Sequence, residues 1–163
     1  MVEIKVKRKD THIGELEFTG DWVDVRASAM VPVNLKKSEL LESYRAAQRN
    51  MDGVHVLKGD TLKIYHGFCL ELPKGYEADL RPRGSLFKKL GLIFTASGVI
   101  DEGYNGDNDE WFSTFYATKD CEICVNERIC QFRIQKKQPE IEFKNVHSLG
   151  NADRGGHGST GDF

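Results

Sequence analysis

Short stretches in which apolar and polar residues alternate are the feature that most constrains this sequence. Apolar side chains recur at every second position in residues 2–6, 68–72, 130–134 and 141–143. A period of two places them on one face of an extended strand. Turns rich in glycine separate these stretches, as they do in the antiparallel sheets of a sandwich or jelly roll. The chain is therefore predicted to be mostly β.

Length and charge narrow the class of protein further. The chain has 163 residues, and roughly 100–200 residues is the usual size of one domain, so residues 1–163 are expected to form a single domain. Lysine and arginine total 23 against 25 acidic residues, for a net charge of −2, which argues against nucleic-acid binding or anionic lipid as a partner. The sequence has neither a membrane span nor the apolar run of a secretion signal. We expect a cytoplasmic protein.

Residues 38–52 depart from the alternating pattern and are predicted to form a helical insertion. Ser38 is placed to cap a helix of about four turns. Its shared face is predicted to consist of Leu40, Leu41, Tyr44 and Ala47. An amphipathic helix most often packs on its own sheet, but the segment is also a candidate docking site for a protein partner.

Three segments carry residue types suited to phosphate chemistry. Residues 81–85 set two arginines around a proline turn, and the small residues after them let backbone N–H groups approach an anion. Residues 98–107 are predicted to be a strand entering a tight hairpin, with Asp101 at the strand end as the general-base candidate. The glycine-rich residues 150–163 contain Arg154 and many N–H donors able to wrap a phosphate chain.

Two further patterns are weaker. Cys121 and Cys124 form a lone CxxC pair with no second pair or nearby histidine, which favours ordinary strand residues over a zinc or redox site. The acids Asp107, Asp109 and Glu110 suit either Mg²⁺ attraction or a solvated turn, and they do not match an EF-hand loop.

Taken together and in order, these segments resemble the five motifs of the trimeric dUTPases (dUTP diphosphatases), a family of all-β jelly-roll enzymes. The matching segments are residues 21–28, 81–85, 98–107, 126–132 and 154–161. The resemblance is greatest to the Gram-positive and phage branch. It implies a distorted jelly roll with one helical insertion. It also implies a homotrimer with shared active sites, in which the flexible arm of one chain, residues 150–163, closes over a site formed by two others.

The resemblance also implies roles for individual residues. Asp101 orients a water for in-line attack on the α-phosphorus of dUTP, giving dUMP and pyrophosphate, while Mg²⁺ is held by phosphates and waters. Asp24 and Arg128 form a supporting ion pair, and Tyr104 packs on deoxyribose. The substrate-binding residues are Arg83, Gly84, Ser85, Gly98, Ile100, Tyr104, Gln131, Arg154, Gly156, His157, Gly158, Ser159 and Thr160.

Three positions depart from the family pattern. Gly84 stands where the second motif usually has serine, and residues 94–98 lack the asparagine that commonly contacts uracil. His157 stands where an aromatic residue normally stacks on the base. We therefore expect a neighbouring aromatic to take over the stacking, with Phe112 the first candidate and Trp111 the second.

Two alternative functions remain open at this point. The homologous dCTP deaminases share the fold and use a hairpin glutamate to activate water, for which Glu110 is the nearby candidate. A nucleotide-responsive regulatory protein, in which residues 38–52 recruit a partner, belongs to a different class and is compatible with enzymatic activity.

Overall fold

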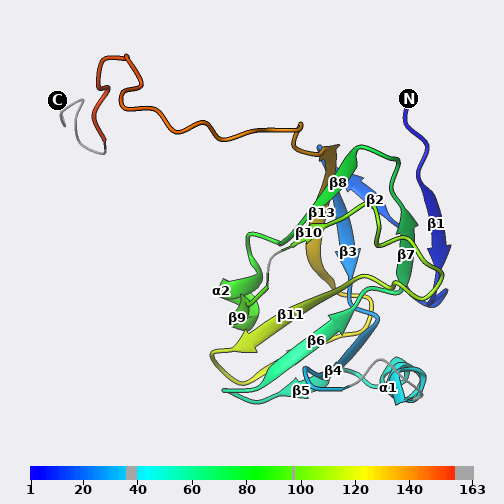
Figure 1. Ribbon diagram of the computed structural model, residues 1–163. Coiled ribbons are helices and arrows are strands. Elements are labelled where there is room, and N and C mark those ends of the chain that lie inside the picture. Colours follow the sequence, from blue (N-terminus) through cyan, green and yellow to red (C-terminus); the bar gives the residue numbers. More distant parts are fainter. Residues whose placement is uncertain (36–39, 97, 157–163) are drawn as a thin grey trace.

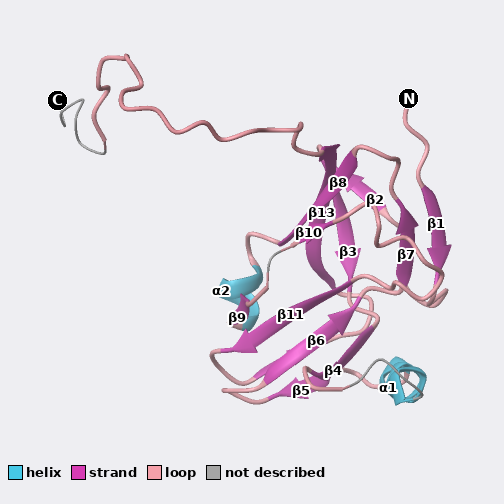
Figure 2. Cartoon of the chain, in the orientation of Figure 1, coloured by secondary structure: helices cyan, strands magenta, loops and turns pink. Residues whose placement is uncertain are grey.

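The computed structural model describes residues 1–35, 40–96 and 98–156, and most of its regular structure is β (Figures 1 and 2). The helices are α1 (Leu40–Arg49) and α2 (Leu86–Leu90). The strands are β1 (Lys5–Arg8), β2 (Glu17–Thr19), β3 (Trp22–Arg26), β4 (Ala29–Pro32), β5 (Val54–Val56), β6 (Thr61–Tyr65), β7 (Phe68–Glu71), β8 (Tyr76–Pro82), β9 (Leu92–Phe94), β10 (Val99–Ile100), β11 (Phe112–Ala117), β12 (Cys121–Ile123) and β13 (Arg128–Lys136). The prediction of a mostly β chain is confirmed. In the part of the chain that the structure covers, neither helix is long and apolar enough to cross a bilayer.

Two larger sheets hold the core between them. One has the strand order β10-β8-β13-β3-β2 and the other β4-β6-β11-β9, while β1 pairs with β7 and β12 with β5. The pairings are antiparallel, and β13 lies between β8 and β3. Val25, Leu80 and Phe132 of the first sheet and Ile64 and Phe115 of the second belong to one buried cluster. The predicted alternation at residues 130–134 thus places Phe132 in this core.

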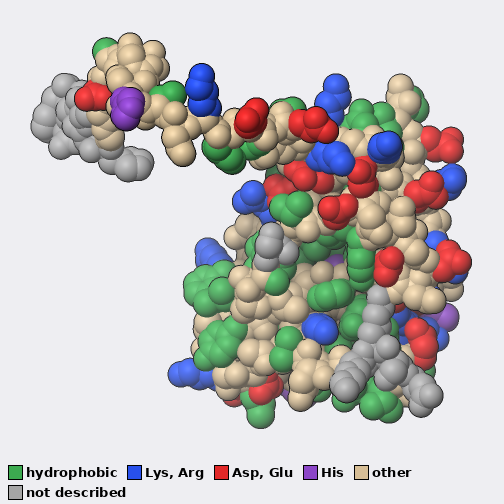
Figure 3. Space-filling view, viewed as in Figure 1, with side chains coloured by type: hydrophobic (Ala, Val, Ile, Leu, Met, Phe, Trp, Pro, Cys, Tyr) green, Lys and Arg blue, Asp and Glu red, His purple; other side chains and the backbone are tan. Residues whose placement is uncertain are grey.

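The chain leaves the body of the molecule after β13. Residues 137–163 are called the C-terminal segment here; the arm, residues 150–163, is its end. The described part of this segment carries no regular structure and projects away from both sheets (Figures 1 and 3). The strand predicted at residues 141–143 is therefore wrong. Ile141 and Phe143 are 55% and 88% exposed, because the described part of this chain pairs no strand with them.

Helix α1 packs on its own sheet, but through a different face from the predicted one. Leu41 is buried as expected, whereas Leu40 and Ala47 are exposed and the polar Arg45 and Gln48 are buried. Gln48 explains part of this difference, since its side-chain amide accepts a hydrogen bond from Met30 N at 2.8 Å and donates one to Met30 O at 2.7 Å. A buried amide thus satisfies the backbone of β4 much as a neighbouring strand does. The predicted cap, Ser38, lies outside the described residues, and α2 is a short helix that the pattern did not predict.

His66 is a fully buried histidine between the sheets. Its Nδ1 lies 3.0 Å from the carbonyl oxygen of Arg26, and its Nε2 lies 2.8 Å from Ser113 Oγ. Burial lowers the pKa of His66 to about 4, although the hydrogen bond to Arg26 acts in the opposite direction. The side chain is therefore neutral in the folded protein at neutral pH.

This depressed pKa predicts a loss of stability in mild acid. An unfolded histidine titrates near pH 6.5, so between pH 6.5 and pH 4 protons bind the unfolded chain in preference to the folded one. The free energy of unfolding should fall by about 2 kcal/mol between about pH 7.5 and pH 5 on account of His66. Urea titrations across this range should show a smaller fall in His66→Gln, while His147→Gln, at an exposed position, should behave like the wild type. An unchanged pH slope in His66→Gln would contradict the assignment.

Candidate functional site

A pocket of about 360 Å³ opens between the edge of the first sheet and β11. Residues of β8, β10 and β11 line it, together with the loop between β10 and β11, residues 101–111, which we call the pocket loop. Among the predicted site residues the pocket collects Gly98, Ile100, Asp101, Tyr104 and Phe112. All but Phe112 come from residues 98–107, so this predicted segment does line a cavity.

Gly98 lets the chain approach β8 more closely than any other residue allows. Its carbonyl oxygen accepts a hydrogen bond from Leu80 N at 2.7 Å. A Cβ atom at Gly98 would lie 1.6 Å from the carbonyl oxygen of Leu80, a distance that no side chain tolerates. Val99 and Ile100 then pair with Asp79 and Ala78 of β8. The edge of the pocket is thus held by backbone contacts.

The predicted tight hairpin at residues 98–106 is wrong. Strand β10 pairs with β8, while β11 pairs with β6 and β9 in the other sheet. The pocket loop therefore crosses from one sheet to the other instead of returning beside β10. The pocket lies where the chain passes between the two sheets, since residues of β8 and β10 line it on one side and residues of β9 and β11 on the other.

Asp101 stands at the start of the pocket loop with an exposed side chain. Its Oδ1 accepts a hydrogen bond from Gly103 N at 2.8 Å, and its backbone carbonyl accepts one from Tyr104 N at 3.0 Å. This turn fixes the direction of the carboxylate while leaving it in contact with solvent. A carboxylate held in this way can orient and deprotonate a water molecule.

Tyr104 is half-buried, not exposed on a hairpin tip as the predicted role on deoxyribose assumed. Its hydroxyl donates a hydrogen bond to the backbone carbonyl of Glu110 at 3.0 Å. Burial raises the pKa of Tyr104 to about 12, and the negative charge of Asp109 acts in the same direction. The phenol therefore stays protonated, and its hydrogen bond to Glu110 links the two ends of the pocket loop.

The two aromatic candidates for base stacking lie in different surroundings. Phe112 lines the pocket, with its ring 5.5 Å from that of Tyr65. Trp111 has no exposed surface and packs against Phe68 and Phe132 in the core. Because neighbouring strand residues point to opposite faces, only one of the pair faces the pocket, and Trp111 is excluded as a stacking residue.

A second group of predicted residues gathers around Asp24, a buried carboxylate on β3. Arg128 Nη1 lies 3.2 Å from Asp24 Oδ2, and Arg83 Nε lies 3.6 Å from Asp24 Oδ1. Gln131 stands opposite Asp24 in the sheet register. The ion pair expected between Asp24 and Arg128 is present, and Asp24 holds Arg83 as well. Gly84 and Ser85 follow Arg83 at the exposed start of α2.

The two groups are not brought together within one chain. Ile100 pairs with Ala78, whereas Arg83 follows the far end of β8. At about 3.3 Å per residue, the stretch from residue 78 to residue 83 spans roughly 16 Å. Arg154 and Gly156 belong to the chain after β13, which projects away from both sheets (Figure 1). His157, Gly158, Ser159 and Thr160 lie outside the described residues.

Several residues that line the pocket are not predicted as site residues from the sequence. Leu80, Phe94 and Thr114 line the cavity alongside the predicted residues, but in the sequence they look like ordinary strand positions. Phe94 stacks on Phe115 with a ring distance of 5.5 Å. Only knowledge of which strands face each other at the sheet crossing could have identified them.

Glu110, the candidate glutamate of a deaminase, does not line the pocket. Its side chain is almost wholly buried, with Oε1 2.6 Å from Arg45 Nη2 and Oε2 accepting a hydrogen bond from Gly67 N at 3.1 Å. A carboxylate held in this way is not available to activate a water molecule at a bound base. Among the described residues, no three histidine, cysteine, aspartate or glutamate side chains are grouped to hold a metal ion.

Known proteins with similar sequences share one description. A family model described as dUTPase matches residues 51–161. The SPbeta prophage-derived deoxyuridine 5'-triphosphate nucleotidohydrolase YosS of Bacillus subtilis is 44% identical over 98% of this chain and 99% of its own length. The deoxyuridine 5'-triphosphate nucleotidohydrolase of Fusobacterium nucleatum is 30% identical over 98% of this chain and 97% of its own.

Solved structures agree with the predicted fold class. The dUTPase of Staphylococcus bacteriophage 80alpha with dUPNHPP superposes with a TM-score of 0.63 at 19% identity, over 99% of each chain. A variant of the dUTPase from phage phi11 of S. aureus, described with a structural Mg(II) ion, gives a TM-score of 0.65 at 13% identity, over 91% of this chain and 99% of that one. The likeness of fold, the family model and the near full-length similarity to YosS agree, and the chain belongs to the dUTPase family.

Proposed function

We propose that the protein hydrolyses dUTP to dUMP and pyrophosphate. The observation that carries the proposal is the carboxylate of Asp101, which a turn fixes at the mouth of a pocket built by the segment that resembles the third dUTPase motif. Asp101 orients a water molecule and takes its proton as the water oxygen bonds to the α-phosphorus. The bond from that phosphorus to the oxygen bridging toward the β-phosphate breaks, and pyrophosphate leaves.

The pocket is suited to a base and its deoxyribose. Backbone groups between Gly98 and the pocket loop pair with uracil, and the close approach of Gly98 to β8 leaves a rigid wall against a thymine methyl group. Phe112 stacks on the base, supported from behind by Tyr65 and by Lys63, whose Nζ lies 5.2 Å from the Phe112 ring centroid. Tyr104 packs on the sugar.

Arg83, Ser85 and Gln131 bind the phosphate chain, with Asp24 and Arg128 as the supporting ion pair. Arg154 and Gly156, with the arm residues that follow, complete the site around the γ-phosphate. When bound with the triphosphate, Mg²⁺ neutralises charge on the phosphate oxygens.

These groups come from different chains in the proposed enzyme, which is a homotrimer. Asp101 and Arg83 lie too far apart in one chain to meet on one triphosphate. The C-terminal segment exposes large apolar side chains that an isolated subunit leaves in water: Ile141, Phe143, Val146 and Leu149. Apolar surface of this kind marks a protein contact, and other copies of the chain supply it.

Pyrophosphate release from dUTP, dCTP, dTTP and UTP, each with Mg²⁺, tests the function. We expect kcat/KM for dUTP to exceed that for each of the others by at least about 100-fold, since rigid backbone contacts and a close wall discriminate by shape and hydrogen bonding. Ammonia release from dCTP in a parallel assay would indicate a deaminase instead. Equal rates on all four nucleotides would overturn the assignment to uracil.

A further inference from the structure

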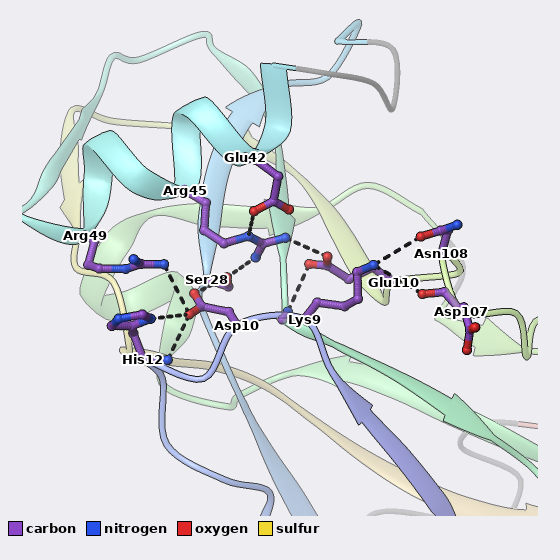
Figure 4. Close-up of polar contacts among 11 residues, drawn as sticks. Lys9, Asp10, His12, Ser28, Glu42, Arg45, Arg49, Asp107, Asn108 and Glu110 are labelled. Carbon is purple, nitrogen blue, oxygen red and sulfur yellow. Dashed lines mark hydrogen bonds and ion pairs between the residues drawn. The ribbon is translucent and has the colours of Figure 1, made fainter.

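A buried polar cluster joins helix α1 to the pocket loop (Figure 4). Arg45 of α1 reaches into the body of the molecule, and its Nη2 lies 2.6 Å from Glu110 Oε1. Both side chains are only 2% exposed. The other Glu110 oxygen accepts the hydrogen bond from Gly67 N. The end of the pocket loop is thus fixed to α1 through one ion pair, from which water is excluded.

The rest of the cluster holds Arg45 from the other side. Arg45 Nη1 donates a hydrogen bond to Ser28 Oγ, which in turn donates one to Asp10 Oδ2 at 2.7 Å. Burial raises the pKa of the Asp10 carboxyl, but hydrogen bonds from Ser28 and His12 N and the charges of Arg45 and Arg49 outweigh it and lower the pKa overall. Asp10 is therefore ionised, and its negative charge partly balances the positive charge of Arg45, with Ser28 hydrogen-bonded between them.

Exposed members complete the charge balance around Arg45. Glu42 Oε2 lies 3.4 Å from Arg45 Nε, and Arg49 Nη2 lies 3.7 Å from Asp10 Oδ1. Lys9 Nζ donates hydrogen bonds to the carbonyl of Asp107 and to Asn108 Oδ1, at 3.3 and 3.1 Å. Of these three exposed side chains, Glu42, Arg49 and Lys9, only Lys9 contacts the pocket loop.

The backbone of Glu110 carries the connection onward to the pocket. Tyr104, which lines the pocket, donates its hydroxyl hydrogen bond to the Glu110 carbonyl. The next residue, Trp111, is anchored in the core and donates from its backbone N to the carbonyl of Phe68 at 3.0 Å. One residue therefore fixes Arg45 through its side chain and Tyr104 through its main chain.

A separate apolar contact links the same two regions. Leu41 of α1 and Tyr65 of β6 belong to a small buried cluster distinct from the main core, and Phe112 packs against it. Phe112 is also a wall of the pocket. Helix α1 thus supports two pocket residues. It is linked to Tyr104 through the Arg45–Glu110 ion pair and to Phe112 through apolar packing.

We propose that Arg45 is a positioning residue for the reaction, which acts through Glu110 to hold Tyr104 and the pocket loop against the nucleotide. The inference rests on the proposed function. A buried ion pair contributes little net stability compared with an apolar pair, yet loss of one partner leaves the other charge buried and unpaired. Without Arg45, the buried Glu110 carboxylate loses its counter-ion, and the peptide group whose carbonyl accepts from Tyr104 keeps only the Trp111 anchor and is held less rigidly.

Steady-state kinetics of Arg45→Met test this role. Because Tyr104 contacts the sugar in both ground state and transition state, KM for dUTP should rise by about tenfold while kcat changes by less than about threefold. The preference for dUTP over UTP should also fall. Arg45→Lys, which keeps a charge for Glu110, should recover a large part of the loss. Arg49→Met lies on the same helix and touches Asp10 but not Glu110, and it should leave KM unchanged.

Hydrogen exchange of the wild-type enzyme gives a second measurement that needs no variant. Saturation with a non-hydrolysable dUTP analogue should slow exchange by at least about threefold in α1 as well as in the pocket loop. Protection of the pocket loop without α1, or equal KM changes in Arg45→Met and Arg49→Met, would overturn the inference while leaving the enzyme assignment intact. A wild-type enzyme that neither binds the analogue nor hydrolyses dUTP would overturn the proposed function itself.

Discussion

Replacing Asp101 with asparagine is expected to lower kcat for dUTP hydrolysis by about 10³-fold, with KM changed only a few-fold. Asparagine has nearly the same shape, and its Oδ1 can still accept the hydrogen bond from Gly103 N that fixes the turn. It cannot take a proton from water at neutral pH. The loss should therefore fall on the chemical step, as measured by pyrophosphate release at saturating dUTP.

A matched control lies in the same loop. Asp109 Oδ2 accepts a backbone hydrogen bond within the pocket loop, from Gly106 N at 2.8 Å, but Asp109 does not line the pocket. Asp109→Asn should keep kcat within about twofold of the wild type, since a neutral amide preserves the turn. If Asp109→Asn lost as much activity as Asp101→Asn, or if Asp101→Asn kept a tenth of the wild-type kcat, the carboxylate would not be the base.

The sequence was most informative where a pattern needs no distant partner. Alternation identified the strands around Phe68 and Phe132, because one buried face is a property of the strand itself. It failed at residues 141–143, which have the same period but no partner strand in the described part of the chain. A period of two predicts which face is apolar and does not say which chain covers it.

Helix α1 shows a second kind of limit. Its apolar positions suggested a face with Leu40 and Ala47, yet the buried face contains Arg45 and Gln48. Glu110 and Ser28 hold the two terminal nitrogens of Arg45, and the backbone of Met30 satisfies Gln48, so both polar side chains are tolerated inside the protein. The spacing of apolar residues along a helix does not identify hydrogen-bond partners that are distant in the sequence. It therefore does not predict which polar side chains of the helix are buried.

The site divides along the same line. The order of motifs pointed to Asp101, Tyr104 and the ion pair between Asp24 and Arg128. In the structure, Asp101 and Tyr104 line the pocket and the ion pair is present. Of the two aromatic candidates, the sequence analysis placed Phe112 first, and the structure buries Trp111 and leaves Phe112 on the pocket. In the proposed enzyme, the assembly of the two groups into one site depends on contacts between chains, which a sequence pattern within one chain does not predict.

Two inactive variants are expected to restore each other when mixed. Asp101→Asn lacks the base but keeps its arm, whereas a chain shortened to end at residue 149 keeps Asp101 and lacks Arg154 and all that follows. The shortened chain should lose about 100-fold or more in kcat/KM, because charged and N–H donors to the phosphates are removed. Each variant alone should form trimers of normal size with little activity.

Joint unfolding and refolding of the two variants in equal amounts produces mixed trimers. A site works when its pocket comes from a shortened chain and its arm from an Asp101→Asn chain, which random mixing gives in about one quarter of sites in a closed symmetric assembly. Activity should therefore recover to about one quarter of the wild-type value per site. Mixing the folded trimers without exchange should give no recovery.

A chain with both changes provides the decisive comparison. Refolded with the shortened chain, it contributes neither an arm nor a working pocket, so activity should not exceed that of the shortened chain alone, whatever the geometry. Should the arm instead close over the pocket of its own chain, every site in the first mixture would lack either its base or its arm, and no activity would return. Recovery in the first mixture and none in the second requires an arm that reaches across subunits. We expect this because the chain after β13 projects away from its own sheets (Figure 1) and exposes Phe143 and Leu149.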